Sequence, residues 1–289
     1  MAVARECGAD CVVTHGGGGA VGMGKMVALT LGFPLICIVT TYSGSELTSI
    51  QSMIENGVKK MHRTPHPRMR VYDAHLAKSL PVALSIQSGV NACAHPICVL
   101  FSSKATRIQR ALAPPGISGM LAALQGIHDS EVNPISDDAM LELRDEAFHA
   151  AFMCQSSSAG PFGLGHRVAH VLVGTFGLVH ASCHSAVLSR VIALNSVADP
   201  QAAATLAGIL KCSSEDVAAT FYGIQQKLGA VTSLEEIGLK LEDIGSVVEH
   251  IMKEVANPSY LADPRPWDEQ IITQMLTDMW HDRPPSAYV

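Results

Sequence analysis

The spacing of hydrophobic residues changes once along the chain, near residue 80. Before that point, short continuous apolar runs alternate with glycine- and threonine-rich segments, which is typical of parallel strands in an α/β sheet. From Pro81 onward, strand-like runs become rare and helical periodicity dominates. We therefore expect an α/β domain at residues 1–80 and an all-helical domain at residues 81–289, with a ligand cleft between them.

The pattern also places the individual elements. In the first part we expect the end of a helix at residues 1–10, strands at Asp10–His15, Pro34–Val39 and Arg70–Ala74, and an exposed hairpin or loop at Ile54–Arg70. In the second part we expect helices at Val82–Ser102, Ile117–Ile127, Asp137–Gln155, Gly163–Val173, His180–Asn195, Pro200–Leu210, Ser214–Lys227, Leu239–Val255 and Asp268–Met279. Breaks are predicted at Ala113–Gly116 and Gln155–Gly160, and the tail Asp282–Val289 is expected to fray.

Two histidine pairs with a spacing of four residues lie close together in the chain: His166 and His170, then His180 and His184. On a helix, residues four apart share one face. Gly174 and Gly177 separate the pairs and allow two helices to turn toward each other. Asn91 and His95 repeat the same spacing upstream. These pairs predict one shared pocket, and the alternative is buried histidines that bond to the backbone.

Four consecutive glycines, Gly16–Gly19, stand between the first predicted strand and a predicted helix. Glycines let backbone N–H groups approach a phosphate closely, and a helix N-terminus favours negative charge. Lys25 lies in the first turns of that helix and is expected to reach a phosphate. The hydroxyl-rich segment Thr40–Thr48 follows the second predicted strand, where open α/β sheets bind ligands. The pattern predicts a nucleotide site, with a plain flexible turn as the alternative.

Composition narrows the class of protein. Hydrophobic residues make up 48% of the 289 residues and charged residues only 16%, which indicates a large core and further surface hidden in an oligomer, for which we expect a homodimer. The net charge of −6 argues against nucleic acid and anionic membranes as partners. We find neither a signal peptide nor an uncharged apolar run of membrane-spanning length.

The eight cysteines are scattered, without a CxxC motif, and most have apolar neighbours. This usage is typical of reduced thiols, so we expect a cytoplasmic protein. Cys93 and Cys183 lie beside the histidine pairs in the sequence and are candidates for the same pocket.

Six stretches, in this order, resemble the iron-containing alcohol dehydrogenase superfamily, which has a dehydroquinate synthase-like fold: GGGGAVGMGK, TTYSGSELT, SGVNACAH, GHRVAHVLVGTFGLVHASCH, SLEEIGL and DPRPW. The maleylacetate reductase branch looks most similar, because it shares the TTY-x-GSE, N-A-x-A-H, GGTF and PH-x-x-x-H variants. The resemblance implies a partial Rossmann-like dinucleotide domain followed by an all-helical metal or substrate domain.

The resemblance also implies roles for single residues. The cofactor NAD(P) would be bound by Gly16, Gly17, Gly18, Gly19, Lys25, Thr40, Thr41 and Ser45. In metal-dependent members an aspartate and three histidines bind iron or zinc, at the positions of Asn91, His95, His166 and His180. His170 matches an active-site histidine near the nicotinamide, and His184 matches one found in the maleylacetate reductases.

Two departures from the family pattern stand out. Asn91 replaces the metal-binding aspartate, and a neutral amide is a poor ligand beside a carboxylate, so we expect a metal-free site, with zinc or iron as the alternative. The histidines would then donate hydrogen bonds, and His170 or His95 would supply a proton. The family normally has roughly 80–90 residues before the position of Met1, and without their strands we expect an exposed sheet edge and weakened NAD(P) binding.

Three functions follow from these observations. The first is an NAD(P)H-dependent reductase of a small conjugated keto acid or carbonyl compound, which is an oxidoreductase like maleylacetate reductase. The second is a cofactor-independent, non-redox enzyme of the cyclase or isomerase type that uses the histidine pocket in secondary metabolism. The third is a non-catalytic, dimerising relic that binds a partner protein or ligand. We favour the first, because the glycine loop and the TTYSGSE segment are both present.

Overall fold

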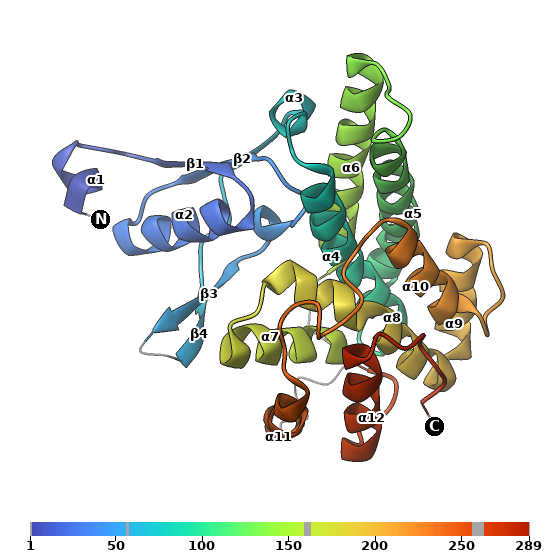
Figure 1. Cartoon of the computed structure of the whole chain (residues 1–289). Coiled ribbons are helices and arrows are strands. Elements are labelled where there is room, and N and C mark those ends of the chain that lie inside the picture. The colour runs from blue at the N-terminus through green and yellow to red at the C-terminus, as the bar shows by residue number, and fades with distance from the viewer. Residues whose placement is uncertain (1, 56–57, 159–162, 256–262, 289) are drawn as a thin grey trace.

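The computed structural model describes residues 2–55, 58–158, 163–255 and 263–288. A small α/β part lies on one side of a larger array of helices (Figure 1). After a short helix α1 (Ala2–Glu6), strand β1 (Val12–Gly16) pairs in parallel with β2 (Leu35–Val39), which pairs in parallel with β5 (Met69–Tyr72). The predicted parallel strands and the strand–glycine loop–helix unit are therefore confirmed.

Helix α2 (Gly18–Leu31) covers one face of this sheet. An added Cβ at Gly24 would approach Thr14 Cγ2 to 2.1 Å, so the helix can lie this close only because residue 24 is a glycine. On the opposite face, Val13, Ile36 and Met69 form a row across the three strands, and Val13 and Met69 are 55% and 56% exposed. Parallel sheets are normally covered on both faces. The homodimer expected to hide such a surface stays a prediction.

A second, antiparallel pair of strands extends from the α/β part. Strands β3 (Ile50–Glu55) and β4 (Val58–Arg63) pair from Ile50 with Arg63 to Glu55 with Val58. The hairpin expected at Ile54–Arg70 is thus present, but it begins four residues earlier than the sequence pattern indicated. A short 3₁₀ turn, Ser45–Leu47, lies between β2 and this hairpin.

From residue 74 on, the regular elements of the described chain are helices. They are α3 (Ala74–Ala77), α4 (Val82–Phe101), α5 (Arg107–Asp129), α6 (Asp137–Ser157), α7 (Leu164–Phe176), α8 (His180–Ala198), α9 (Pro200–Leu210), α10 (Val217–Lys227), α11 (Ile244–Val255) and α12 (Glu269–Trp280), with a 3₁₀ turn at Leu241–Asp243. The fold class predicted from the sequence, a partial Rossmann-like unit followed by helices, is confirmed. The division into two domains near residue 80 stays a prediction.

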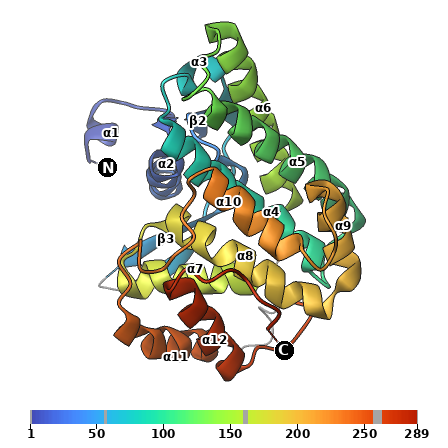
Figure 2. The same ribbon diagram turned by 45° about the vertical axis from the view of Figure 1, so that its right-hand side comes forward.

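Helix α4 runs through the middle of the helical array (Figure 2). Its residues, Val82–Phe101, are long and apolar enough to cross a membrane, with a mean hydropathy of 1.3, but 78% of that stretch is buried inside the protein. The expectation that no uncharged run reaches this length is therefore wrong. The apolar character of α4 is accounted for by its contacts with the surrounding helices.

The predicted break at Ala113–Gly116 is wrong, because α5 continues through both prolines. A capping box starts the helix: the Gln109 N–H donates to Thr106 Oγ1 at 3.3 Å, and the Thr106 N–H donates to Gln109 Oε1 at 2.7 Å. On either side of the prolines, Ala113 and Ile117 are completely buried in the core. This burial outweighs the backbone hydrogen bonds that the prolines cannot donate.

The turn between the two histidine helices is made by one glycine rather than two. Gly177 has φ +69°, a left-handed conformation that ends α7, whereas Gly174 lies inside that helix. The predicted end of the helix at Val173 is therefore three residues too early.

The tail expected to fray is ordered by long-range contacts, as far as residue 288. The buried Arg190 donates from Nη2 to the carbonyl of Arg283 at 2.6 Å, 93 residues away in sequence. Arg265 Nη1 donates to the carbonyl of Tyr288 at 2.8 Å, and Tyr288 is only 3% exposed. Local sequence signals cannot show such partners.

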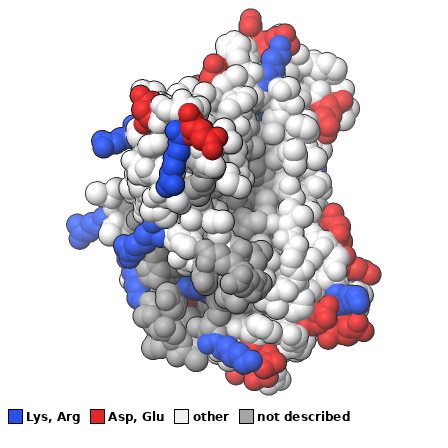
Figure 3. Space-filling view, turned by 90° about the vertical axis from the view of Figure 1, so that its left-hand side faces the viewer, with Lys and Arg blue, Asp and Glu red and all other residues white. Residues whose placement is uncertain are grey.

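The face on the α/β side of the molecule shows its described Lys and Arg side chains scattered around the rim (Figure 3). They form no continuous positive patch among the described residues of this face. The expectation that nucleic acids are not partners stays a prediction.

Candidate active site

Five histidines from three helices form one cluster, which we call the histidine cluster: His95 on α4, His166 and His170 on α7, and His180 and His184 on α8. Their rings are neighbours, with centroid distances of 4.7 Å between His95 and His166, 4.6 Å between His166 and His184, 4.5 Å between His180 and His184, and 6.1 Å between His170 and His180. The structure thus brings together all five histidines that the sequence pattern singled out.

Direct contacts connect two members of the cluster. Nε2 of His166 lies 3.1 Å from Nδ1 of His95, which is a hydrogen-bond distance. Nδ1 of His166 lies 3.7 Å from Cys98 Sγ. Cys98 was missed from the sequence, although it follows His95 by three residues and therefore shares its face of α4.

The two cysteines predicted near the pocket behave differently from Cys98. Cys93 is completely buried, and its thiol interacts with that of Cys154 on α6. Cys183 is also completely buried, within α8. Cys98 contacts the histidine cluster through His166.

Burial determines the charge of the inner histidines. It lowers the pKa of His95 to about 4, with repulsion from His180 acting in the same direction. Burial and the neighbouring histidines also hold the pKa of His166 and His184 well below the ordinary value. These three rings are neutral at pH 7, so each can donate one hydrogen bond and accept one. His170 is half-buried and His180 is exposed, so solvent reaches both.

Asn91 lies one turn before His95 on α4 and is 5% exposed. Its Oδ1 atom is buried and has no hydrogen-bond partner in the described structure. Among the described residues, no three His, Cys, Asp or Glu side chains are arranged to hold a metal ion. Two of the expected ligands, His95 and His166, are hydrogen-bonded to each other, and no carboxylate is present to balance a dication. Asn91 therefore gives the site a neutral amide at the position where the family resemblance implies a metal-binding carboxylate.

The glycine loop lies at the N-terminus of α2, whose cap residue Gly17 has no side-chain hydrogen bond. An added Cβ at Gly17 would approach Thr41 Cγ2 to 2.8 Å, and one at Gly18 would approach Ser43 Oγ to 3.1 Å. At the exposed Gly19 an added Cβ would meet no atom within 4 Å. The first turn of α2 thus has no side-chain cap and is open beside Gly19.

The predicted hydroxyl residues lie along the same loop. The Thr40 N–H donates to the Gly16 carbonyl at 3.2 Å, which joins the two predicted segments. Thr41 packs against Gly17, and Ser45 begins the 3₁₀ turn that follows. Thr40 and Thr41 are therefore next to the glycine loop, and Ser45 is one turn further along.

Lys25 differs from the expectation that it reaches a phosphate. Its side chain is completely buried, and Nζ donates to the Ser45 carbonyl, to Thr48 Oγ1 at 2.7 Å and to the Ile50 carbonyl at 3.1 Å. The three oxygens occupy the donors of the ammonium group. Lys25 holds α2 to the segment between the 3₁₀ turn and β3, instead of pointing at the helix N-terminus.

The burial of Lys25 predicts how the free energy of unfolding depends on pH. Burial lowers its pKa from 10.5 to about 8, so between those pH values the unfolded chain binds more protons than the folded one. The free energy of unfolding of the wild type, minus that of Lys25→Met, is therefore expected to rise with pH over this interval. Urea denaturation measures it. Lys240→Met is the control, because the Lys240 side chain is 73% exposed. If the free energy of unfolding of the wild type, minus that of Lys240→Met, rose with pH by the same amount, the prediction would be contradicted.

Two charged residues that the sequence did not single out hold the TTYSGSE segment in place. Glu46 is 2% exposed; its Oε1 accepts a hydrogen bond from the Tyr72 hydroxyl at 2.8 Å, and burial raises its pKa. The buried Arg144 of α6 donates from Nη1 to the Tyr42 hydroxyl at 3.0 Å and from Nη2 to the Leu80 carbonyl at 2.7 Å. These bonds connect the loop after β2 to the sheet and to the helices.

Models of known protein families match both parts of the chain. Residues 85–280 match the C-terminal part of the Fe-containing alcohol dehydrogenase family, and residues 1–74 match the iron-containing alcohol dehydrogenases. Maleylacetate reductase of Pseudomonas knackmussii is 33% identical over 288 residues, which are 99% of this chain and 78% of that protein.

Solved structures that resemble this chain belong to the same family. The maleylacetate reductase of Agrobacterium tumefaciens is 33% identical with a TM-score of 0.87, over 98% of this chain and 78% of that one. An iron-containing alcohol dehydrogenase of Corynebacterium glutamicum is 31% identical with a TM-score of 0.84, over 96% and 76% of the two chains. None of these relatives supports a non-redox enzyme.

Proposed function

This chain belongs to the iron-containing alcohol dehydrogenase family and is an oxidoreductase, and we propose that it reduces a small conjugated keto acid with NAD(P)H, as a maleylacetate-reductase-like enzyme. The observation that carries the proposal is the histidine cluster, which gathers five imidazoles from α4, α7 and α8 in one place. The maleylacetate reductases among the relatives support the choice of substrate class.

The cofactor site of this proposal is the glycine loop. The first N–H groups of α2 bind the pyrophosphate, and Thr41 packs against Gly17 of the loop. When bound, NAD(P)H supplies the hydride. Lys25 contributes indirectly: its hydrogen bonds to the carbonyls of Ser45 and Ile50 hold the segment that follows Thr40 and Thr41.

In this proposal the histidines divide two tasks. The inner rings of His95 and His184 are neutral, so they can donate hydrogen bonds to an enolate or carboxylate oxygen, while His166 orients His95 by the hydrogen bond between them. His170 is half-buried, so solvent can deliver a proton to it and it can pass that proton to the reduced substrate. Burial lowers the pKa of His95 to about 4, which favours His170 over His95 as the proton source.

We propose further that the enzyme works without a metal. The family's enzymes use NAD(P) and usually iron, but Asn91 offers an amide where those enzymes have a carboxylate. The neutral, mutually bonded His95 and His166 support the same proposal. At 3.1 Å, one ring can donate a hydrogen bond to the other in the absence of an ion.

The test is a titration of NADH and NADPH by fluorescence, with metal analysis of the same sample, followed by nicotinamide oxidation with maleylacetate as substrate. We expect micromolar binding and turnover in protein that contains no stoichiometric metal. Protein that binds neither nucleotide at millimolar concentration would overturn the proposal. Turnover that appears only after iron or zinc is added would overturn its metal-free part.

Two neighbouring glycines provide a sharper test of the cofactor site. Gly19→Ala is expected to leave the melting temperature unchanged, because its Cβ meets no protein atom, but to weaken NADH binding at least about tenfold by obstructing the phosphate. Gly17→Ala is expected to lower the melting temperature, because its Cβ would lie 2.8 Å from Thr41. Thermal denaturation and NADH titration of both variants measure the difference; unchanged NADH binding by Gly19→Ala would contradict the placement of the cofactor.

A further inference from the structure

The carboxylate of Asp263 contacts α7, α8 and Trp267, which lies in the non-helical segment just before α12. Its Oδ2 atom accepts hydrogen bonds from the Leu164 N–H at 2.8 Å and from Trp267 Nε1–H at 3.2 Å. Its Oδ1 atom accepts one from Asn195 Nδ2–H at 3.3 Å. An added Cβ at Gly163 would lie 2.6 Å from Oδ1, so the carboxylate is packed tightly against the backbone there.

The contact with Leu164 is made at the start of α7, the helix that carries His166 and His170. The first N–H groups of a helix have no partner within it, and a negative charge near them stabilises the helix. The cap residue Gly163 has no side chain to fill this role. Asp263 fills it from 99 residues away in the sequence.

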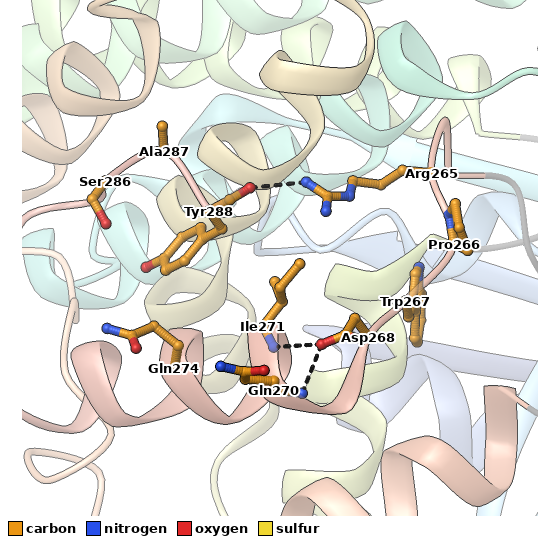
Figure 4. Close-up of a pocket in the computed structure, with 10 residues that line it drawn as sticks. All are labelled: Arg265, Pro266, Trp267, Asp268, Gln270, Ile271, Gln274, Ser286, Ala287 and Tyr288. Carbon is orange, nitrogen blue, oxygen red and sulfur yellow. Dashed lines mark hydrogen bonds between the residues drawn. The ribbon is translucent and has the colours of Figure 1, made fainter.

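Asp263 is itself held by its surroundings. Trp267, which is 8% exposed, lines a cavity of about 790 Å³ between the start of α12 and the chain's C-terminal segment (Figure 4). Its indole N–H fixes the carboxylate from that side, and Asn195 fixes it from α8. Burial, with the nearby Asp263 carboxylate as a second cause, raises the pKa of the Cys98 thiol to about 12, and this thiol contacts His166.

We propose that Asp263 is a positioning residue of the active site: by binding the Leu164 N–H it fixes the start of α7 relative to α8 and so sets the orientation of His166 and His170. His166 follows Leu164 by two residues, so a rotation or shift of the first turn moves its ring directly. The inference rests on the proposed reductase function, because that function is what makes the orientation of these histidines matter.

Two substitutions separate geometry from charge. Asp263→Ala removes all three acceptor contacts. Asp263→Asn keeps an oxygen for Leu164 and Trp267, and its new N–H₂ group faces Asn195, whose own Oδ1 has no described partner. We expect kcat for keto acid reduction to fall about 10- to 100-fold in Asp263→Ala, and Asp263→Asn to restore most of it. The KM for NADH is expected to stay unchanged, because none of the contacts described for Asp263 reaches the glycine loop.

A second readout does not depend on activity. In protein labelled with ¹⁵N-histidine, the ring signals of His166 and His170 should shift in Asp263→Ala and return in Asp263→Asn. Asp268→Ala is the matched control, because Asp268 caps α12 by accepting from the Gln270 and Ile271 N–H groups and has no described contact with α7. It should lower the melting temperature without moving the histidine signals.

Unchanged kcat and unchanged histidine signals in a folded Asp263→Ala protein would overturn the proposal. The same histidine shifts in Asp268→Ala would also overturn it, because they would reflect general loosening of the helices. If the wild type reduces no keto acid, the proposed function fails, but the histidine spectra still decide the role of Asp263.

Discussion

Replacement of His170 with alanine is expected to lower kcat by about 10²- to 10⁴-fold, the range that a positioned general acid contributes. His170 belongs to the histidine cluster, yet it is half-buried, so it can exchange protons with solvent. His95, His166 and His184 have lowered pKa values and stay neutral. Steady-state kinetics with NADH and maleylacetate measures the loss, and added imidazole should restore part of it by delivering the missing proton.

His149→Ala is the control for this experiment, because His149 is exposed on α6, outside the histidine cluster. It should leave kcat unchanged. If His170→Ala keeps its full kcat, the proton comes from another ring. The same conclusion follows if imidazole restores activity to His95→Ala but not to His170→Ala.

Asn91→Asp is expected to convert the site into a metal site. The new carboxylate would lie one turn before His95 on α4 and would supply a negative charge for a cation held by the histidines. Without metal, a buried carboxylate that has no partner should lower the free energy of unfolding by about 3–5 kcal/mol. Zinc at 100 times its dissociation constant should return about 2.7 kcal/mol.

Thermal unfolding with and without zinc, combined with metal analysis, measures both effects. The wild type and Asn91→Ala are the controls, because neither has a carboxylate at this position; their melting temperatures should not respond to zinc. A wild-type protein that binds one zinc ion as tightly as Asn91→Asp would contradict the metal-free site.

Local signals in the sequence were enough for the elements that depend on local chemistry. The apolar run Pro34–Val39 must be buried wherever it lies, so it predicts strand β2 without knowledge of its neighbours. Gly16–Gly19 between a strand and a helix predicts the loop at the start of α2. A spacing of four residues puts two histidines on one face of any helix, so the pairs on α7 and α8 were found correctly.

Several positions needed the tertiary structure because their partners are distant in sequence. Lys25 is spaced as if to bind phosphate, yet its ammonium group is enclosed by the carbonyls of Ser45 and Ile50. The two prolines of α5 look like a break until α4 and α6 are seen to bury the residues around them. Asp263 caps α7 across 99 residues.

The sequence by itself therefore determined the family, the order of strands and helices and the five histidines of the site. These follow from the spacing of residues along one segment, which does not depend on where the other segments lie. Only the tertiary structure decided which rings are neutral, which cysteine contacts them and what holds α7 in place. Desolvation and hydrogen bonding act across space, so the pKa of His95, the contact of Cys98 with His166 and the cap by Asp263 exist only once the helices have packed.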